Sequence, residues 1–321
     1  MKIEVMSYSD LRTKKLEQLR WMIPKILREG VTILSGAPKS GKSRFVLEAT
    51  LAVSTGKGFG SLLCERGTCL YLALEDNNRS FNERLEYMLN GEEFPSNAHV
   101  AMTWTRGESA LDGIEEWIQK HPDCKLVAID TLQMVRPPQT GQNMYEFDYE
   151  SIARFRPLAA THGIAIVIVH HTRKSADTDF INKVSGTLGL TGAADAVMVL
   201  ERKKGSEYGV VQVTGRSVAE NKFAIYFPPS LSRLKIIDYE KFQLSEERKR
   251  IVELLEDIDE PLRPYDISLY LDNDACSTRK LLSRMVKDGQ IVKVSRGSYA
   301  VKEKRSDEER ADELQEKLAL I

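Results

Sequence analysis

The stretch "GAPKSGKS", residues 36–43, limits the possible folds more than any other part of this sequence. It matches the pattern GxxxxGK[ST], follows the apolar stretch "VTILS" and precedes a helical pattern, which is the context that this motif requires. Its glycines let backbone amides turn inward around phosphate oxygens, and the following helix adds the positive end of its dipole. The sequence therefore predicts a strand, a phosphate-binding loop and a helix in this order, with a chance glycine-rich turn as the alternative.

Each residue of this stretch is a candidate nucleotide contact. Lys42 would supply a positive charge to the β and γ phosphates, and the Ser43 hydroxyl would complete the shell of a bound Mg²⁺ ion. The expected cofactors are therefore ATP and Mg²⁺. The candidate residues are Gly36, Ala37, Pro38, Lys39, Ser40, Gly41, Lys42 and Ser43.

Residues 31–237 alternate short apolar stretches with amphipathic ones, which predicts an α/β fold with a mostly parallel sheet covered on both faces. Because the last strands lie close together in the chain, the sheet should end in an antiparallel meander. The expected strands are 31–35, 68–74, 98–104, 126–131 and 164–170, then 196–200, 210–214 and 223–227. The expected helices are 42–54, 81–89, 109–120 and 146–162.

The pattern changes after residue 238. Three helical segments followed by the two-strand ribbon "QIVKVSRGSYAV" predict a small winged helix-turn-helix domain. The highly charged end of the chain predicts a solvated helix or a disordered tail, with docking to a partner as the alternative. The expected organisation is an N-terminal segment (1–30) packing on the core or a neighbouring subunit, an α/β core (31–240), a winged helix-turn-helix (245–301) and a charged tail (302–321).

The composition is that of a soluble globular protein. The 321 residues are 42% hydrophobic and 29% charged, and the net charge of -1 gives no global attraction to nucleic acid, so any basic surface must be local. The N-terminus lacks the apolar segment of a signal peptide, and no apolar run is long enough to span a membrane. A cytoplasmic protein with no membrane partner is expected. The four cysteines lack the spacing of a zinc site.

Acidic residues follow two of the predicted strands. Asp130 ends the apolar stretch "KLVAID", whereas Glu75 and Asp76 end "CLYLALED". Because the carboxyl ends of parallel strands share one edge of the sheet, these acids should face the phosphate-binding loop. Asp130 is the candidate second anchor for Mg²⁺, and Glu75 is the candidate base that activates water. Helix capping is the alternative for all three acids.

Two histidines end another predicted strand in "AIVIVHHTRKS". A metal site, an acid–base pair, a phosphate sensor and an ordinary strand end are all compatible with this segment alone. Adjacent strand residues point to opposite faces, so His170 and His171 cannot easily share one metal ion through the strand.

In order and spacing, six blocks resemble the RepA-type hexameric helicases of plasmids, phages and mobile elements, which belong to the RecA-like P-loop ATPases. The resemblance spans roughly residues 15–240. The blocks are "GAPKSGKS", "LALED" followed by Arg84, "VAIDTL", "YEFDYESI" leading to "IVIVHHTRKS", "VSGTLGLTGAADAVMVLER" and "VTGRSV".

The resemblance implies a homohexameric ring in which each ATP lies between two subunits and single-stranded DNA passes through the centre. Lys42 and Ser43 would hold the nucleotide and the metal, and Asp130 would be the Walker B acid. Glu75 would be the catalytic base. At the end of the histidine strand the resemblance implies a polar sensor of the γ phosphate, without indicating which histidine it is.

Arg216 in "VTGRSV" resembles the arginine that reaches a phosphate across the subunit boundary. Such an arginine couples hydrolysis to assembly, because the charge that stabilises the transition state comes from the neighbour. Family members often carry an acid after this arginine, whereas this chain has Ser217. An ion pair that positions Arg216 must therefore come from elsewhere, and a surface arginine is the alternative.

Two groups of basic residues are candidate DNA contacts. The loops at 136–143 and 173–189 follow the fourth and fifth strands, where RecA-like rings place the elements that line the channel. In the winged helix-turn-helix, residues 276–300 hold six basic residues against one acid, a local net charge of +5. This module could bind duplex DNA or a replication protein. The candidate contacts are Arg173, Lys174 and Lys183 in the loop, and Ser277, Thr278, Arg279, Lys280, Arg284 and Arg296 in the C-terminal module.

Three functions fit these residues. The favoured one is an ATP-driven DNA helicase, or a helicase-like ring motor, in replication of a mobile element, phage or plasmid. An ATP-gated initiator or regulator that binds a specific DNA site without unwinding is the second, and a recombinase filament is the third.

Overall fold

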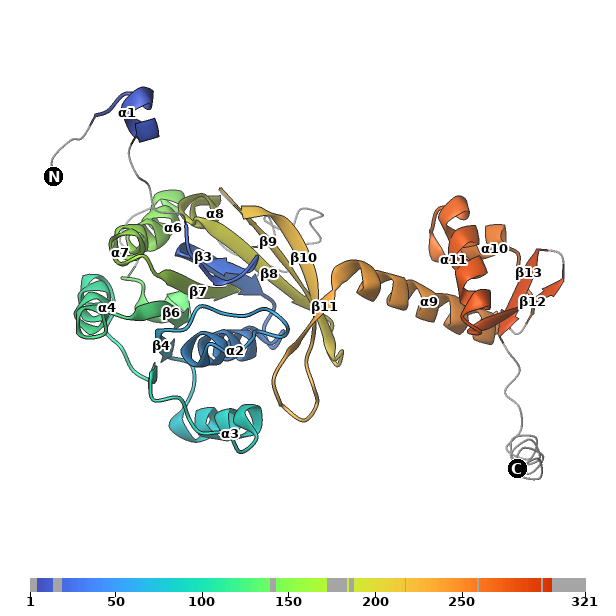
Figure 1. Cartoon of the computed structure of the whole chain (residues 1–321), viewed down its shortest axis with the longest axis horizontal. Coiled ribbons are helices and arrows are strands. Elements are labelled where there is room, and N and C mark those ends of the chain that lie inside the picture. Colours follow the sequence, from blue (N-terminus) through green and yellow to red (C-terminus); the bar gives the residue numbers. More distant parts are fainter. Residues whose placement is uncertain are drawn as a thin grey trace. The chain divides into compact units, whose positions relative to one another are not determined.

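The computed structural model describes residues 5–13, 19–138, 143–171, 184, 188–216, 218–258, 260–295 and 297–301. The chain divides into two compact units, Met1–Tyr239 and Glu240–Ile321 (Figure 1). Within the described part of the chain, no helix is both long and apolar enough to cross a membrane.

The first unit is built on a nine-stranded sheet with the order β11-β10-β9-β8-β3-β7-β6-β4-β5. Strands β3 to β8 pair in parallel, and β9, β10 and β11 continue the sheet as an antiparallel meander. Both features confirm the sequence prediction. The strands are β3 (Gly30–Gly36), β4 (Thr68–Ala73), β5 (Ala98–Ala101), β6 (Cys124–Asp130), β7 (Ala165–His171), β8 (Ala196–Arg202), β9 (Tyr208–Gly215), β10 (Val218–Tyr226) and β11 (Lys235–Asp238).

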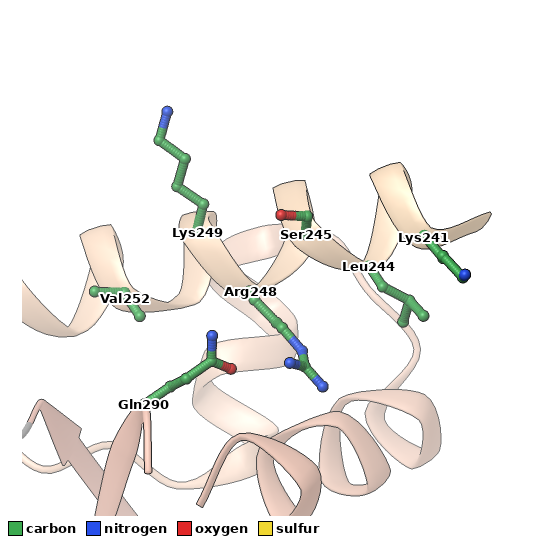
Figure 2. Close-up of a pocket in the computed structure, with 7 residues that line it drawn as sticks. All are labelled: Lys241, Leu244, Ser245, Arg248, Lys249, Val252 and Gln290. Atoms are coloured by element: carbon green, nitrogen blue, oxygen red, sulfur yellow. The ribbon is translucent and has the colours of Figure 1, made fainter. Parts of the chain in front are cut away.

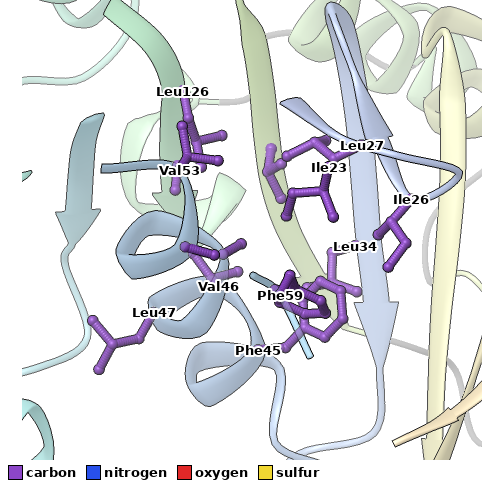
Figure 3. Packing of buried hydrophobic residues seen from close by; sticks show 14 of the residues in the cluster. Ile23, Ile26, Leu27, Leu34, Phe45, Val46, Leu47, Val53, Phe59 and Leu126 are labelled. Carbon is purple, nitrogen blue, oxygen red and sulfur yellow. The ribbon is translucent and has the colours of Figure 1, made fainter. Parts of the chain in front are cut away.

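Helices cover both faces of this sheet, as the buried rows of its strands require. On one face, side chains of α2 (Lys42–Thr55) and α3 (Asn78–Leu89) share a cluster with β3, β6 and β7, and Phe45 meets Phe59 at its centre (Figure 3). The other face packs against the remaining helices. These are α4 (Glu108–Lys120), α5 (Leu132–Val135), α6 (Met144–Ala153), α7 (Phe155–His162) and α8 (Leu188–Ala193).

The helix predicted over 146–162 is instead two helices, α6 and α7, which meet at Arg154. Proline explains the break. Pro157 has no backbone N–H to donate to the carbonyl of Ala153, and its ring crowds that carbonyl. The prediction of strand 98–104 was also too long, because β5 ends at Ala101.

The described N-terminal residues contain three elements that the sequence did not predict. Strands β1 (Trp21–Ile23) and β2 (Leu27–Arg28) form a hairpin whose buried Met22, Ile23 and Leu27 join the cluster on the α2 face. The described residues of α1 (Tyr8–Thr13) are exposed.

The described residues of the second unit form three helices and a two-stranded ribbon, in the predicted order. They are α9 (Tyr239–Ile258), α10 (Pro264–Leu271), α11 (Ala275–Lys287), β12 (Ile291–Ser295) and β13 (Ser298–Val301). Their shared core includes Ile251, Ile267, Leu282 and Met285, each almost fully buried. The identification of this unit as a winged helix-turn-helix stays a prediction.

A buried ion pair ties α2 to the segment that precedes β11. Glu48 of α2 is fully buried, and its carboxylate accepts hydrogen bonds from the Arg233 guanidinium and from the Leu234 amide, the latter at 3.0 Å. Burial raises the pKa of Glu48, and Arg233 opposes that rise. The pair therefore keeps a charged side chain inside the core.

Replacing Arg233 with methionine should lower the free energy of unfolding by about 3 kcal/mol, because the Glu48 carboxylate loses its buried counter-charge. Denaturant unfolding followed by tryptophan fluorescence measures the loss. The matched control is Arg79→Met, which removes an exposed ion pair with Glu83 and should cost at most about 1 kcal/mol. Equal losses for the two variants would contradict this account.

Candidate functional site

The loop between β3 and α2 has the backbone of a phosphate cradle. Lys39 and Gly41 adopt φ angles of 63° and 105°, which turn successive backbone amides toward one side. The Lys42 ammonium is buried and donates hydrogen bonds to the carbonyls of Gly36 at 2.7 Å and Ala37 at 3.0 Å. Burial lowers the pKa of Lys42, while Asp130 and Glu75 oppose that fall. The lysine is thus held inside the loop, where a phosphate would lie.

Two of the loop's glycines are required by close contacts. A Cβ on Gly36 would lie 2.6 Å from the Leu200 carbonyl oxygen of the neighbouring strand β8. A Cβ on Gly41 would lie 2.7 Å from the Phe227 ring, at a φ angle that other residues rarely adopt. The loop is therefore wedged between β8 and the end of the meander.

The sequence analysis missed two residues beside this loop. The guanidinium carbon of Arg202 lies 4.5 Å from the centroid of the Phe227 ring, which itself contacts Gly41. Arg202 ends β8, a strand parallel to β3, so the strand-end rule that selected Glu75 could have found it. Phe227 follows an antiparallel strand, and no sequence signal indicated its position.

The two predicted acids lie at this same edge of the sheet, and each accepts a hydrogen bond from a hydroxyl. The Tyr71 hydroxyl donates to Asp130 Oδ2 at 3.0 Å, and the Thr131 hydroxyl donates to Glu75 Oε1 at 2.9 Å. Burial raises the pKa of Asp130, and hydrogen bonds from Ser43 and Tyr71 oppose that rise.

Helix capping, the alternative role for these acids, is wrong. The N-cap of α3 is Asn77, whose side chain accepts from the Ser80 amide at 3.0 Å, and Asp76 pairs with Arg84. The N-cap of α5 is Thr131, not Asp130. Neither Glu75 nor Asp130 is therefore the N-cap of a helix.

The donor set fits a hard divalent ion. Mg²⁺ prefers oxygen ligands and is bound by one or two carboxylates together with substrate phosphates. Asp130 and the Ser43 hydroxyl supply such oxygens next to the phosphate loop. Among the described residues, no three His, Cys, Asp or Glu side chains converge on a common point, so a softer ion finds no ligand cluster there.

The two histidines lie on opposite faces of β7. His171 follows Val167 and Val169 on the face that packs against α2, the face that Asp130 shares with Leu126 and Ala128. His170 lies on the other face with Ile168. The Nδ1 atom of His171 is buried and has no hydrogen-bond partner among the described residues. His171 is therefore the histidine on the side of the phosphate loop.

Arg216 lies at the opposite edge of the sheet. Gly215 pairs with Ala196 at the start of β8, whereas the phosphate loop follows the end of β3, beside Leu200. The seven residues of β8 separate these edges by about 20 Å. Arg216 is exposed, borders a hollow of about 500 Å³, and donates to the Gly192 carbonyl of α8 at 2.8 Å. It cannot reach the phosphates of its own chain.

The structure tests the DNA-contact candidates only in part. Arg173, Lys174, Lys183 and Arg296 lie outside the described residues. On α11, Ser277, Arg279, Lys280 and Arg284 are exposed. The prediction that Thr278 contacts DNA is wrong. Its side chain is 2% exposed and its hydroxyl donates to the Asp274 carbonyl, because it lies on the same helical face as Leu281, Leu282 and Met285.

A basic groove in the second unit was also missed. Side chains of α9 and Gln290 line a hollow of about 580 Å³ (Figure 2). Lys241, Arg248 and Lys249 contribute positive charge, and Arg248 pairs with Asp288 at 2.9 Å. In the sequence these cations are interspersed with glutamates, and Lys249 lies 4.0 Å from Glu253 one helical turn away.

Comparison with known proteins gives one family and a shared fold. The sequence profile of a protein family described as an AAA domain matches residues 2–177. No curated protein matches the chain significantly in sequence.

Two solved structures resemble the chain. One, described as an ATPase domain, superposes with a TM-score of 0.52 at 13% identity, covering 70% of this chain and 93% of that one. A DnaB-like replicative helicase, solved to show its interactions with primase, gives a TM-score of 0.52 at 13% identity, covering 64% of this chain and 57% of that one. At this identity the likeness concerns the fold alone, and it confirms the predicted RecA-like core.

Proposed function

Because the chain belongs to the AAA domain family, we propose that it is an ATP-dependent DNA helicase, or a helicase-like ring motor, in replication of a mobile element, phage or plasmid. The observation that carries the proposal is the grouping of Lys42, Asp130 and Glu75 at one edge of a RecA-like sheet. The fold that the chain shares with a solved ATPase domain and with a DnaB-like replicative helicase supports the motor function.

The geometry supports the following roles in this proposal. The loop from Gly36 to Ser43 holds the phosphates of ATP, and Lys42 supplies positive charge to them. Asp130 and Ser43 hold Mg²⁺, which when bound neutralises charge on the transferred phosphoryl group. Glu75, exposed at the edge, orients and deprotonates the attacking water. His171 donates a hydrogen bond to the γ phosphate or to this water.

The partners follow from the same proposal. Single-stranded DNA passes through a homohexameric ring, and Arg173, Lys174 and Lys183 contact its backbone. The exposed basic side chains of α11 contact duplex DNA or a replication protein. Contacts with phosphates alone carry no sequence information, which suits a motor that slides.

Substitution of Lys42 with alanine should lower DNA-stimulated ATP hydrolysis by about 100-fold or more and abolish strand displacement, because the phosphate loop loses its buried charge. A steady-state ATPase assay and a forked-duplex unwinding assay measure the two activities. Lys120→Ala, an exposed lysine of α4 paired with Glu116, is the control and should retain both. A wild-type protein that hydrolyses ATP but displaces no strand under varied loading conditions would overturn the helicase proposal.

Substitution of His171 with leucine should lower DNA-stimulated hydrolysis by about 10-fold or more, because a hydrogen bond to a charged phosphate is lost. His170→Leu is the matched control one residue away on the other face of β7, and it should keep most of the stimulation. Hydrolysis rates with and without single-stranded DNA measure the effect. The reverse ranking of the two variants would place the sensor on His170.

Arg216→Ala should lower hydrolysis by about 1,000-fold, since the arginine stabilises transition-state charge in the neighbouring subunit. The decisive measurement mixes this inactive variant with inactive Lys42→Ala. Mixed rings contain interfaces in which an intact phosphate loop faces an intact Arg216, so activity should reappear. Absence of any recovery, with mixing verified by size-exclusion chromatography of tagged subunits, would contradict action across the interface.

The second candidate is an ATP-gated initiator that binds a defined DNA site. The exposed side chains of Arg279, Lys280 and Arg284 on α11 favour it. Footprinting separates the two functions: protection of one duplex sequence without translocation supports the initiator, whereas length-dependent binding to single strands supports the motor.

A further inference from the structure

Strands β4 and β6 hold the two acids of the site by crossed hydrogen bonds. The strands are adjacent and parallel, and Ala73 is paired with Asp130. β4 provides the Tyr71 hydroxyl for the acid of β6, and the residue after β6 provides the Thr131 hydroxyl for the acid that follows β4. Each strand thus supplies one carboxylate and one hydroxyl to the other.

We propose that Tyr71 and Thr131 are positioning residues that divide the work of the site: Tyr71 orients Asp130 toward Mg²⁺, and Thr131 orients Glu75 toward the attacking water. The inference rests on the proposed ATP hydrolysis. It deepens that function by assigning separate kinetic effects to two hydroxyls that act through the carboxylates of Asp130 and Glu75.

Packing fixes the orientation of the Tyr71 side chain. It is 3% exposed, and its ring meets the Phe81 ring of α3 edge to face, with centroids 5.6 Å apart. The hydroxyl donates to Asp130 Oδ2, and with the hydrogen bond from Ser43 it fixes the orientation of the carboxylate beside the phosphate loop.

The Thr131 hydroxyl binds Glu75 rather than its own helix. It is 2% exposed and occupies the N-cap position of α5, yet its side chain makes no capping bond to that helix. Its single hydroxyl proton goes instead to Glu75 Oε1, on a side chain that is otherwise exposed. The hydrogen bond removes rotational freedom from Glu75 and leaves Oε2 for water.

The Tyr71→Phe variant deletes one oxygen and keeps the ring. It should raise the Mg²⁺ concentration needed for tight binding of a fluorescent ADP analogue by about 10-fold, the usual effect of losing a partner of a metal ligand. Binding of the analogue without Mg²⁺ should not change. Fluorescence anisotropy at graded Mg²⁺ concentrations measures both quantities without relying on turnover.

The Thr131→Val variant keeps the shape of the side chain and deletes the hydroxyl. It should lower kcat for ATP hydrolysis by about 10-fold while the KM for ATP and the Mg²⁺ dependence of binding stay at wild-type values. Thr131→Ser, which restores the hydroxyl, should recover most of kcat. Thermal unfolding of all three variants checks that folding is intact.

The pattern of effects decides the proposal. If Tyr71→Phe and Thr131→Val shifted the same parameter, or if Thr131→Ser failed to recover kcat in a folded protein, the division of roles would be wrong. A wild-type protein that hydrolyses ATP but never unwinds DNA would overturn the helicase proposal alone, since the crossed hydrogen bonds concern hydrolysis. A wild-type protein that binds no Mg²⁺–nucleotide would overturn both.

Discussion

Burial of α2 against the central strands is the interaction on which the site depends. Phe45, Val46 and Val53 of this helix enter the cluster formed by β3, β6 and β7. Because the phosphate loop is the link between β3 and α2, fixing both elements leaves the loop little freedom. The carbonyl of Leu200 and the ring of Phe227 restrict the loop further, because they lie against Gly36 and Gly41. Backbone amides that bind phosphate must be held rigidly in this way, because they stabilise the negative charge most when their dipoles already point toward it.

The α2 helix also holds the chain that leads out of the first unit. Glu48 binds Arg233 and the Leu234 amide, and Arg44 donates to the carbonyls of Pro228 at 3.1 Å and Ser232 at 2.7 Å. These contacts join the helix after the phosphate loop to the residues just before β11. The core of the nucleotide site and the end of the meander therefore form one packed structure. Within it, Arg233, Arg44 and the Leu234 amide oppose the rise in the pKa of the Glu48 carboxyl that burial causes.

Sequence reasoning predicted the part of the site that follows from strand order. The carboxyl ends of parallel strands share one edge, and this rule is sufficient to bring Asp130 and Glu75 to the phosphate loop. It does not predict contacts from antiparallel strands, so Phe227 was missed. It also gives no partner for a side chain, and the hydroxyls of Tyr71 and Thr131 became visible only once the register of β4 and β6 was known. Thr278 was misjudged because a threonine among apolar residues carries no signal of burial when its hydroxyl can bond to its own helix.

The length of β8 keeps Arg216 away from the phosphate loop of its own chain. The arginine and the phosphate loop of the same chain lie at opposite ends of β8, farther apart than any side chain can span. If Arg216 completes the hydrolytic site, a lone subunit would hold both parts of that site and could not bring them together. If Arg216 serves a neighbour's ATP, the rate per subunit rises with protein concentration rather than staying constant, and dilution switches the protein off. Nucleotide would then be spared in a cell until enough copies have gathered to close around DNA.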